Sequence, residues 1–355
     1  MSILYFLYYF IILLSCRSGQ QSVDAANASG AATGGNSLSS VLMDLGRSAE
    51  NAFYSFLELL PGTLGFTAKS TTKKEDVGGY FNSLGAKLGE ASDELEQVAK
   101  KSETELDKDG INKIIRSAVD AAKATLSTLK IHLESLGTVG DSKSVGDAET
   151  TAKQGTASDA TELKKAYNSL KGMVDIATNL GVQELKAGTT TLSIDNVDNK
   201  DGAKILGTDS AATATDVSKA AVILSAVSGE EILKSIIESQ ENDAVVGVSS
   251  NADVNTSALK FAKGGTNNHV SNANTPKAAA VAGGIALCSL VKDGKLSAGA
   301  AANSAGGQGE VQKIGVTAAN KLLGAVEDII KKTVKNVLKT VKEKIDEARA
   351  TKTSE

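Results

Sequence analysis

Two cysteines carry the most distinctive chemistry in this 355-residue chain, Cys16 and Cys288. Cys16 ends the sequence LLSC, which directly follows an uncharged apolar run over residues 2–14. That run is too short to span a bilayer and is typical of a signal-peptide core. Two aliphatic residues, a small residue and a cysteine form the bacterial pattern in which the peptide is cleaved and the thiol receives a diacylglyceryl group. We therefore interpret residues 1–15 as a signal peptide and Cys16 as a lipidated N-terminus.

The alternative is a buried apolar N-terminal segment with an incidental cysteine. The chain begins Met-Ser-Ile, without the basic residue that usually opens a signal peptide, so the position of the true start codon stays open. Lipidation of Cys16 would leave Cys288 without a partner, which excludes an internal disulfide. Cys288 lies in an apolar helical pattern, where we expect a buried and inert thiol.

Other candidate sites do not assemble in the sequence. His132 and His269 have no second histidine or cysteine at zinc-binding or dyad spacing. The segments 107–110 and 198–202 resemble calcium loops, but the twelfth position holds Arg in the first and Thr in the second, where a loop of this kind needs Glu. No phosphate-binding or nucleophile-elbow motif is present. We expect no catalytic residue, no metal and no cofactor, and therefore not an enzyme.

Composition limits the function further. The formal net charge of −4 argues against a nucleic-acid partner, which would normally require a basic excess. Aromatic residues make up 4% of the chain and Trp is absent, so most of the chain cannot supply the aromatic walls of a cofactor or sugar pocket. Only 2 Pro residues are present, which favours long helices.

The elements that would position any site are predicted to be helices. Apolar residues recur every three or four positions, and Gly or Pro ends several of these stretches. Capping boxes are expected at Thr72/Glu75 and Ser228/Glu231, a cap pair at Asp159/Glu162, and a helix start with Pro276 at its first position. The predicted helices cover residues 37–60, 77–98, 111–136, 159–177, 219–227, 230–239, 276–291 and 317–349.

Polar segments separate these helices. Residues 16–36 are rich in Gly, Ser and Ala and predict a flexible tether. We expect one mostly helical domain over residues 37–349, followed by a disordered tail over 350–355. Its polar loops are expected near 138–158, 187–215, 241–275 and 294–310.

Six lysines fill the remaining faces of the last predicted helix. A solvated face is the simpler interpretation, and contact with an anionic membrane surface is the alternative.

Three blocks resemble a known family. FYSFLELLPGTLGFTAKSTTKKEDVGGYFNSLGAKLGEASDELEQVAKKSE looks like the N-terminal region of the large-type variable major proteins (Vlp) of Borrelia. AAAVAGGIALCSLVKDGKLSAGAAANSAGG and NKLLGAVEDIIKKTVKNVLKTVKEKIDEAR resemble their C-terminal helices. The resemblance covers essentially the whole mature chain. The chain is more distantly similar to the variable lipoprotein VlsE. Cys288 departs from the pattern.

The resemblance implies an all-α, elongated helical bundle with both termini toward the membrane and the polar loops at the membrane-distal end. It implies a lipoprotein of the cell outer membrane, exposed at the surface and lipid-anchored through Cys16 alone. The implied function is immune evasion by antigenic variation, with the outer membrane and host antibodies as partners. An adhesin or receptor for host surface molecules is the alternative, an extracytoplasmic enzyme or solute-binding protein is disfavoured, and a homo-oligomer stays open.

Overall fold

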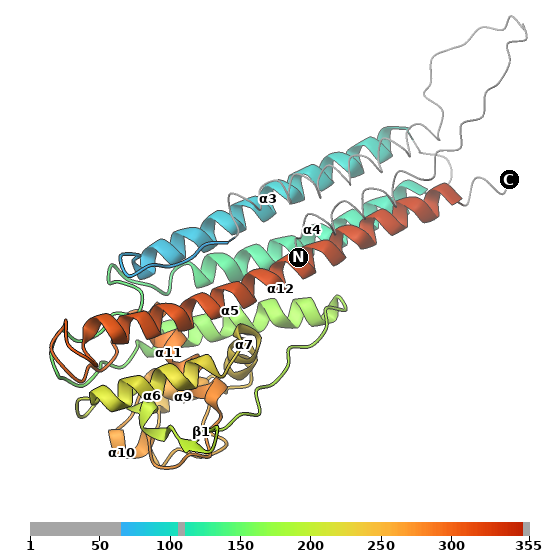
Figure 1. Ribbon diagram of the computed structural model, residues 1–355. Coiled ribbons are helices and arrows are strands. Elements are labelled where there is room, and N and C mark those ends of the chain that lie inside the picture. The colour runs from blue at the N-terminus through green and yellow to red at the C-terminus, as the bar shows by residue number, and fades with distance from the viewer. Residues whose placement is uncertain (1–64, 106–110, 351–355) are drawn as a thin grey trace, which may run out of the picture. The chain divides into compact units, whose positions relative to one another are not determined.

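The computed structural model describes residues 65–105 and 111–350 of the chain, which is mostly helical (Figure 1). The predicted signal peptide, the tether, Cys16, the helix expected over 37–60 and residues 351–355 of the predicted tail lie outside the described residues. The long helices are α3 (Lys74–Glu105), α4 (Ile111–Leu136), α5 (Ala160–Asn179) and α12 (Gln308–Ala350). The shorter helices are η1 (Lys200–Leu206), α6 (Ala214–Ser225), α7 (Gly229–Ile237), α8 (Asp243–Val246), α9 (Ala258–Lys263), α10 (Asn267–Val270) and α11 (Ala278–Leu290).

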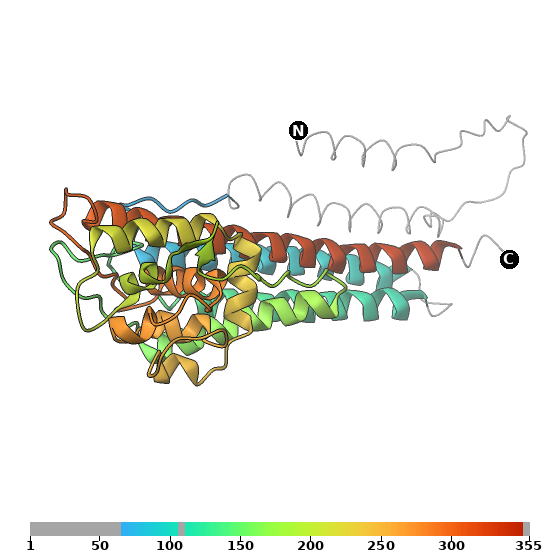
Figure 2. The ribbon, with the colours of Figure 1, turned by 60° about the horizontal axis from the view of Figure 1, so that its bottom comes forward.

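The long helices pack as a bundle, which confirms the predicted helical fold class. α3 and α4 are antiparallel, since Glu96 in the last third of α3 pairs with Arg116 and Lys123 in the first half of α4. α12 packs against both α4 and α5, and Figures 1 and 2 show it running alongside them. The predicted apolar stripes of α3 and α12 are buried, for example at Leu88 and Val334.

The apolar spacing over residues 111–136 predicts a buried stripe on α4 that is partly wrong. The predicted stripe is Ile111, Ile114, Ile115, Ala118, Ala122, Thr125, Leu129, Leu133 and Leu136. Ile114 is 46% exposed, whereas Val119 and Leu126, which the prediction omitted, are fully buried. α4 packs against three helices, so its buried arc is wider than one stripe. Leu180, directly after the end of α5, lines the same open groove as Ile114.

The helices α6 to α11, with the segments between residues 187 and 307 that connect them, form a lobe built around α11. All thirteen residues of α11 are buried, which explains why this segment is apolar on every face. A Cβ at Gly284 would stand 2.4 Å from the Cβ of Phe261 on α9, and one at Gly283 would stand 2.8 Å from the Cβ of Ala258. The two glycines therefore allow α9 to approach α11 closely.

The polar segments fold back onto helices and onto each other. Residues 187–215 contain η1 and an antiparallel hairpin of β1 (Ser193–Ile194) and β2 (Val197–Asp198), with Ser193 opposite Asp198. Asp195 and Asn196 form its two-residue turn with φ of 51° and 61°, a conformation that Asp and Asn tolerate better than most residues. Residues 241–275 contain α8, α9 and α10. The segments 147–156 and 295–298 lie side by side, as in the bond from the Leu296 N–H to the Asp147 carbonyl at 2.8 Å.

Two predicted helix starts are confirmed and three are displaced. Ser228 and Glu231 form the expected capping box, and Asp159 caps α5 through the Glu162 N–H. The box predicted at Thr72 and Glu75 is wrong, because the Lys73 N–H donates to Asp76 instead, one residue later.

α11 begins at Ala278, two residues after Pro276, and α12 begins at Gln308, nine residues before the predicted start at 317. Glu310, in the first turn of α12, accepts a hydrogen bond from the Gly306 N–H at 2.7 Å. No helix among the described residues is both long and apolar enough to cross a membrane.

Candidate functional site

The residues singled out in the sequence do not converge in the structure. Cys16 lies outside the described residues. His132, on α4, packs against Gly172 of α5, and its partial burial lowers the pKa of the imidazole. His269 lies on α10 in the lobe, and Cys288 is buried in α11, where burial raises the pKa of its thiol. Within residues 65–105 and 111–350, no group of three or more His, Cys, Asp or Glu side chains could hold a metal ion.

A buried lysine, which the sequence did not reveal, joins the bundle to the lobe. Lys74 is the first residue of α3 and is 1% exposed. Its Nζ donates to the carbonyl oxygens of Val291 and Gly294, both at 2.7 Å, and of Cys288 at 3.4 Å. These carbonyls lie at and just beyond the C-terminus of α11, the negative end of its helix dipole. Burial lowers the pKa of the Lys74 ammonium, and nearby groups including Asp141 partly offset this shift.

A second lysine repeats this arrangement at another junction. Lys321 of α12 donates to the carbonyl oxygens of Leu224 at 2.8 Å and Val227 at 2.5 Å, at the end of α6. Its partial burial lowers the pKa of the ammonium. Each of these two lysines therefore satisfies carbonyl groups at a helix end that have no partner within the helix.

The extended segment that precedes α3 is fastened along α12 by side chains. Asn320 accepts from the Ala68 N–H at 2.8 Å and donates to the Ala68 carbonyl at 3.0 Å. Glu327 accepts from the Gly65 N–H at 3.1 Å and forms a short hydrogen bond with the Tyr80 hydroxyl. Burial and this carboxylate together raise the pKa of Tyr80 well above its ordinary value.

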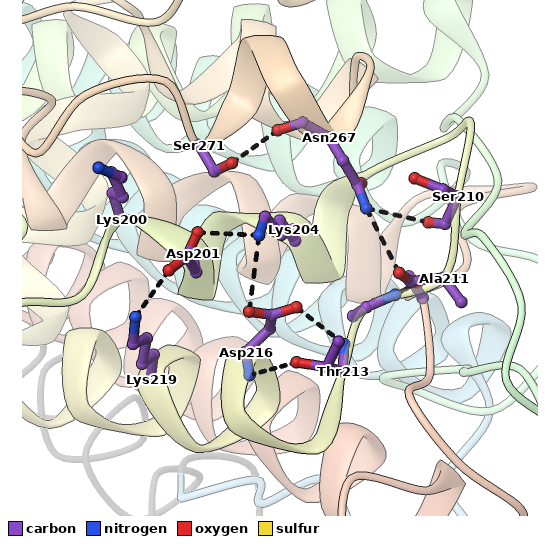
Figure 3. Close-up of polar contacts among 12 residues, drawn as sticks. Lys200, Asp201, Lys204, Ser210, Ala211, Thr213, Asp216, Lys219, Asn267 and Ser271 are labelled. Atoms are coloured by element: carbon purple, nitrogen blue, oxygen red, sulfur yellow. Dashed lines mark hydrogen bonds and ion pairs between the residues drawn. The ribbon is translucent and has the colours of Figure 1, made fainter.

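Within the lobe, four charged side chains join η1 to α6 (Figure 3). Asp201 of η1 accepts from Lys204 at 2.8 Å and from Lys219 of α6 at 2.7 Å. Lys204 also lies 3.8 Å from Asp216, which caps α6. Burial raises the pKa of Asp201, but the hydrogen bonds from the two lysines outweigh it and hold the pKa below its usual value. The charges are matched two to two, as in a structural network.

Asn267, at the start of α10, ties a further segment into the lobe (Figure 3). Its backbone N–H donates to the Asp209 carboxylate at 2.7 Å, and its side-chain amide donates to the carbonyls of Ser210 and Ala211. The backbone carbonyl of Asn267 accepts a hydrogen bond from the Ser271 hydroxyl at 2.7 Å. These hydrogen bonds hold the backbone of residues 209–211 against the start of α10.

A groove with a volume of about 590 Å³ lies between α4 and α12. Ile114, Ala118 and Ala121 line one side, and Val337 and Thr340 line the other. No histidine, cysteine or cluster of carboxylates lines it, since Glu347 is its one acidic residue. The described residues form folded surface segments that pack on buried helices.

These features, a helical bundle with a lobe of folded polar segments and an expected lipid-accepting cysteine, are those of a bacterial surface lipoprotein. The family model described as Borrelia lipoprotein matches residues 49–345, and the chain belongs to this family.

Several relatives are similar over nearly their whole length. Variable large protein 7 of Borrelia hermsii is 59% identical over 342 residues, which cover 96% of this chain and 91% of that protein. Variable large protein 18 of the same organism is 59% identical, with 96% and 93% covered. Variable large protein 14 is 26% identical over 339 residues, with 95% and 90% covered.

The fold also matches a solved structure. The crystal structure of the Lyme disease variable surface antigen VlsE of Borrelia burgdorferi superposes with a TM-score of 0.68 at 23% sequence identity. The match covers 87% of this chain and 99% of that chain. The predicted resemblance to the Vlp family and, more distantly, to VlsE is confirmed.

Proposed function

We propose that this protein is a variable major antigen of the bacterial outer surface, whose role is immune evasion by antigenic variation. The observation that carries the proposal is the 59% identity with Variable large protein 7 across 96% of the chain. The VlsE-like fold supports it, because it places long polar segments on a buried helical support. Segments of this kind can change sequence at little cost to stability, since side chains exposed on them contribute little to the core.

The test is to sequence the expressed gene in serial isolates from one clonal infection. We expect the region after Cys16, or the polar segments within it, to be replaced between isolates while the aliphatic core positions stay apolar. An expressed sequence that stays unchanged while antibodies against it rise would contradict the proposal.

We further propose that Cys16 is acylated and holds the protein on the outer membrane. The LLSC sequence after a 13-residue apolar run supports this assignment. Radiolabelled palmitate should enter the wild-type protein and be absent from the Cys16→Ser variant, which should also leave the membrane fraction. Label that persists in the variant would place the acylation elsewhere.

The adhesin alternative has one structural observation in its favour. Three valines in a ten-residue stretch of the lobe are exposed: Val245 at 50%, Val246 at 45% and Val254 at 51%. Exposed apolar side chains close together can mark an interaction site, although single ones are common. If the lobe is a receptor, the double variant Val245→Ser with Val246→Ser should reduce adhesion of the bacteria to host cells. A receptor would also keep these two residues apolar among serial isolates. Antibody recognition alone would not require this.

A further inference from the structure

One side of α4 is exposed to solvent along almost the whole helix. The ten exposed residues between Lys113 and Glu134 all lie on this side. Six of them form an uncharged row with spacings of three and four residues, and we call it the α4 stripe: Ile114, Ser117, Ala121, Ala124, Thr128 and Ile131. Both ends of the stripe are large apolar residues, of which Ile114 is 46% and Ile131 is 62% exposed. A stripe with this spacing is the kind of face that one helix packs against another.

Neighbouring helices cover the two flanks of α4 and leave the stripe open between them. α3 lies along one flank, where Glu96 pairs with Arg116 and Lys123. α5 lies along the other flank, where the ring of His132 rests on Gly172. The stripe therefore offers a straight helical surface that rises about 26 Å from Ile114 to Ile131.

The groove of about 590 Å³ between α4 and α12 adjoins only one half of the stripe. Ile114 lines it together with Val337 of α12, and the last residue of α4 that lines it is Thr125. Ile131 lies six residues beyond Thr125 and projects into solvent. The stripe thus has a hollow at one half and a projecting apolar side chain at the other half. A second copy of the chain supplies the complement to both when its α4 runs in the opposite direction.

The order of residues in the stripe fits such an antiparallel pair. Isoleucine stands at both ends, a hydroxyl residue follows at each end, and two alanines occupy the middle. A two-fold axis through that middle places Ile114 opposite Ile131 of the second copy. The small residues at the centre allow the two helices to approach closely, while each Ile131 enters the groove of the other chain.

The charges beside the stripe agree with the same direction. The antiparallel pair brings Lys113 close to Glu134 of the second copy, at both ends of the contact. Glu134 already forms an ion pair with Lys130 of its own chain, and a second cation adds to that pair. In a parallel arrangement, lysine would instead lie level with lysine and glutamate level with glutamate, and like charges repel.

The position of the lobe also suits this arrangement. The Lys292 N–H, directly after α11, donates to the Val139 carbonyl at 2.8 Å, three residues beyond the end of α4. The lobe therefore lies at the Leu136 end of α4. In an antiparallel pair the two lobes lie at opposite ends of the contact and do not collide.

We propose that the α4 stripe binds the α4 stripe of a second copy of this chain, antiparallel and about a two-fold axis, with each Ile131 in the groove of the other chain. Ten exposed residues on each side are fewer than the about 20–30 of a standard interface, so the pair is weak and reversible. The pair presents one lobe at each end. The proposal goes beyond the antigenic role and does not depend on it.

The first experiment tests the register by cross-linking with a short bismaleimide. The full chain carries Cys16→Ser together with Ile114→Cys and Ile131→Cys, and Cys288 stays because it is buried. The two introduced thiols lie about 26 Å apart along one helix, so the reagent joins them only between two chains. We expect cross-linked dimer from this double variant and several-fold less from either single variant, since each position lies about 26 Å from its own copy in the antiparallel pair.

The matched control places the second thiol on another exposed apolar residue. Val197 of β2 is 57% exposed, and Ile114→Cys with Val197→Cys should give as little dimer as the single variants. Strong cross-linking of the single variants would indicate a parallel pair, and equal dimer from the control would indicate random collision. Either result would overturn the proposal.

The second experiment measures association without a cross-linker. Sedimentation equilibrium of the full chain carrying Cys16→Ser, from about 10 to about 500 µM, should show a reversible dimer. Ile131→Glu should weaken it at least about tenfold, because the two-fold pair carries the change twice and each carboxylate would enter an apolar groove. Val197→Glu should change it less than about twofold.

Circular dichroism at 222 nm verifies that both variants keep their helices. A chain that stays monomeric over the whole range, or equal weakening by the two variants, would refute the pairing. Neither experiment involves the acyl group or antibodies, so its failure would leave the proposed antigenic role as it stands.

Discussion

Replacing the buried Lys74 by Met should cost this protein a large part of its stability. Met keeps most of the length and volume of the side chain but removes the donor that bonds to three carbonyl groups. Two of those bonds are 2.7 Å long, and the third is 3.4 Å and weaker. A buried acceptor left without a partner costs about 1–3 kcal/mol, while release of the buried charge returns part of this.

We therefore expect Lys74→Met to lower the free energy of unfolding by about 3 kcal/mol. For a domain of this size, that corresponds to a fall in Tm of about 5 °C. The assay is urea unfolding followed by circular dichroism at 222 nm, with thermal unfolding in parallel. The matched control is Lys73→Met, because the side chain of Lys73 is 52% exposed and its pair with Glu75 lies at the surface. We expect the control to change stability by less than about 0.5 kcal/mol.

The direction in which the stability changes with pH gives a second test of this prediction. Burial lowers the pKa of Lys74 in the folded state below its value in the unfolded chain. Between these two pKa values the unfolded state binds more protons at this residue, so its contribution to stability rises with pH. The difference in stability between wild type and Lys74→Met should therefore grow as pH increases toward 10.5, the upper limit of that window. A difference that is constant or shrinks, or a variant as stable as the control, would refute the account of Lys74 as a buried charged donor.

Four further substitutions test the packing and the polar contacts. Gly284→Ala should destabilise the protein by about 2 kcal/mol, because its Cβ would overlap α9, whereas Gly324→Ala, with no atom within 4 Å, should stabilise it by up to about 1 kcal/mol in the same denaturation assay. Tyr80→Phe should cost about 1–2 kcal/mol at neutral pH. Because the folded-state pKa of Tyr80 is raised, the wild-type advantage should fall as pH rises above 10; an advantage that persists there would contradict the bond to Glu327. Asp201→Asn should cost about 1 kcal/mol. Since the folded-state pKa of Asp201 is lowered, that advantage should disappear as pH falls below 3.8, and a loss of stability that is independent of pH would contradict the charge network.

The sequence predicted the fold class and most long helices because their signals are local. Apolar residues at helical spacing indicate a buried face wherever that face is covered, and α3, α5 and α12 follow this rule. The capping pair Ser228 and Glu231 could also be recognised, since both partners lie within four residues. Ile114 was misassigned because its exposure depends on which helices reach it, and periodicity does not record where a neighbouring helix ends.

The polar segments show the limit of composition. Residues 241–275 are rich in Asn, Ser and Gly and lack helical periodicity, yet they contain three short helices. Ser257 and Thr266 cap two of these helices with local bonds, and Phe261 is fully buried against α11. A helix of four to six residues is too short to have a detectable stripe, and its stability comes from tertiary contacts that a single sequence does not display.

By itself, the sequence determined the helical bundle, the resemblance to the Borrelia lipoproteins and the cysteine at which we propose an acyl anchor, since each depends on residues close together in the chain. The tertiary structure alone decided that Lys74 is buried, because its partners lie 214 to 220 residues away. It likewise decided that the glycine pair in α11 serves helix packing. On α12 it decided that Lys321 caps the end of α6, whereas Lys332 and Lys339 of the same helix are exposed. A lysine looks the same in the sequence at both places, and only the elements packed around it determine whether its charge is used inside the protein or presented at its surface.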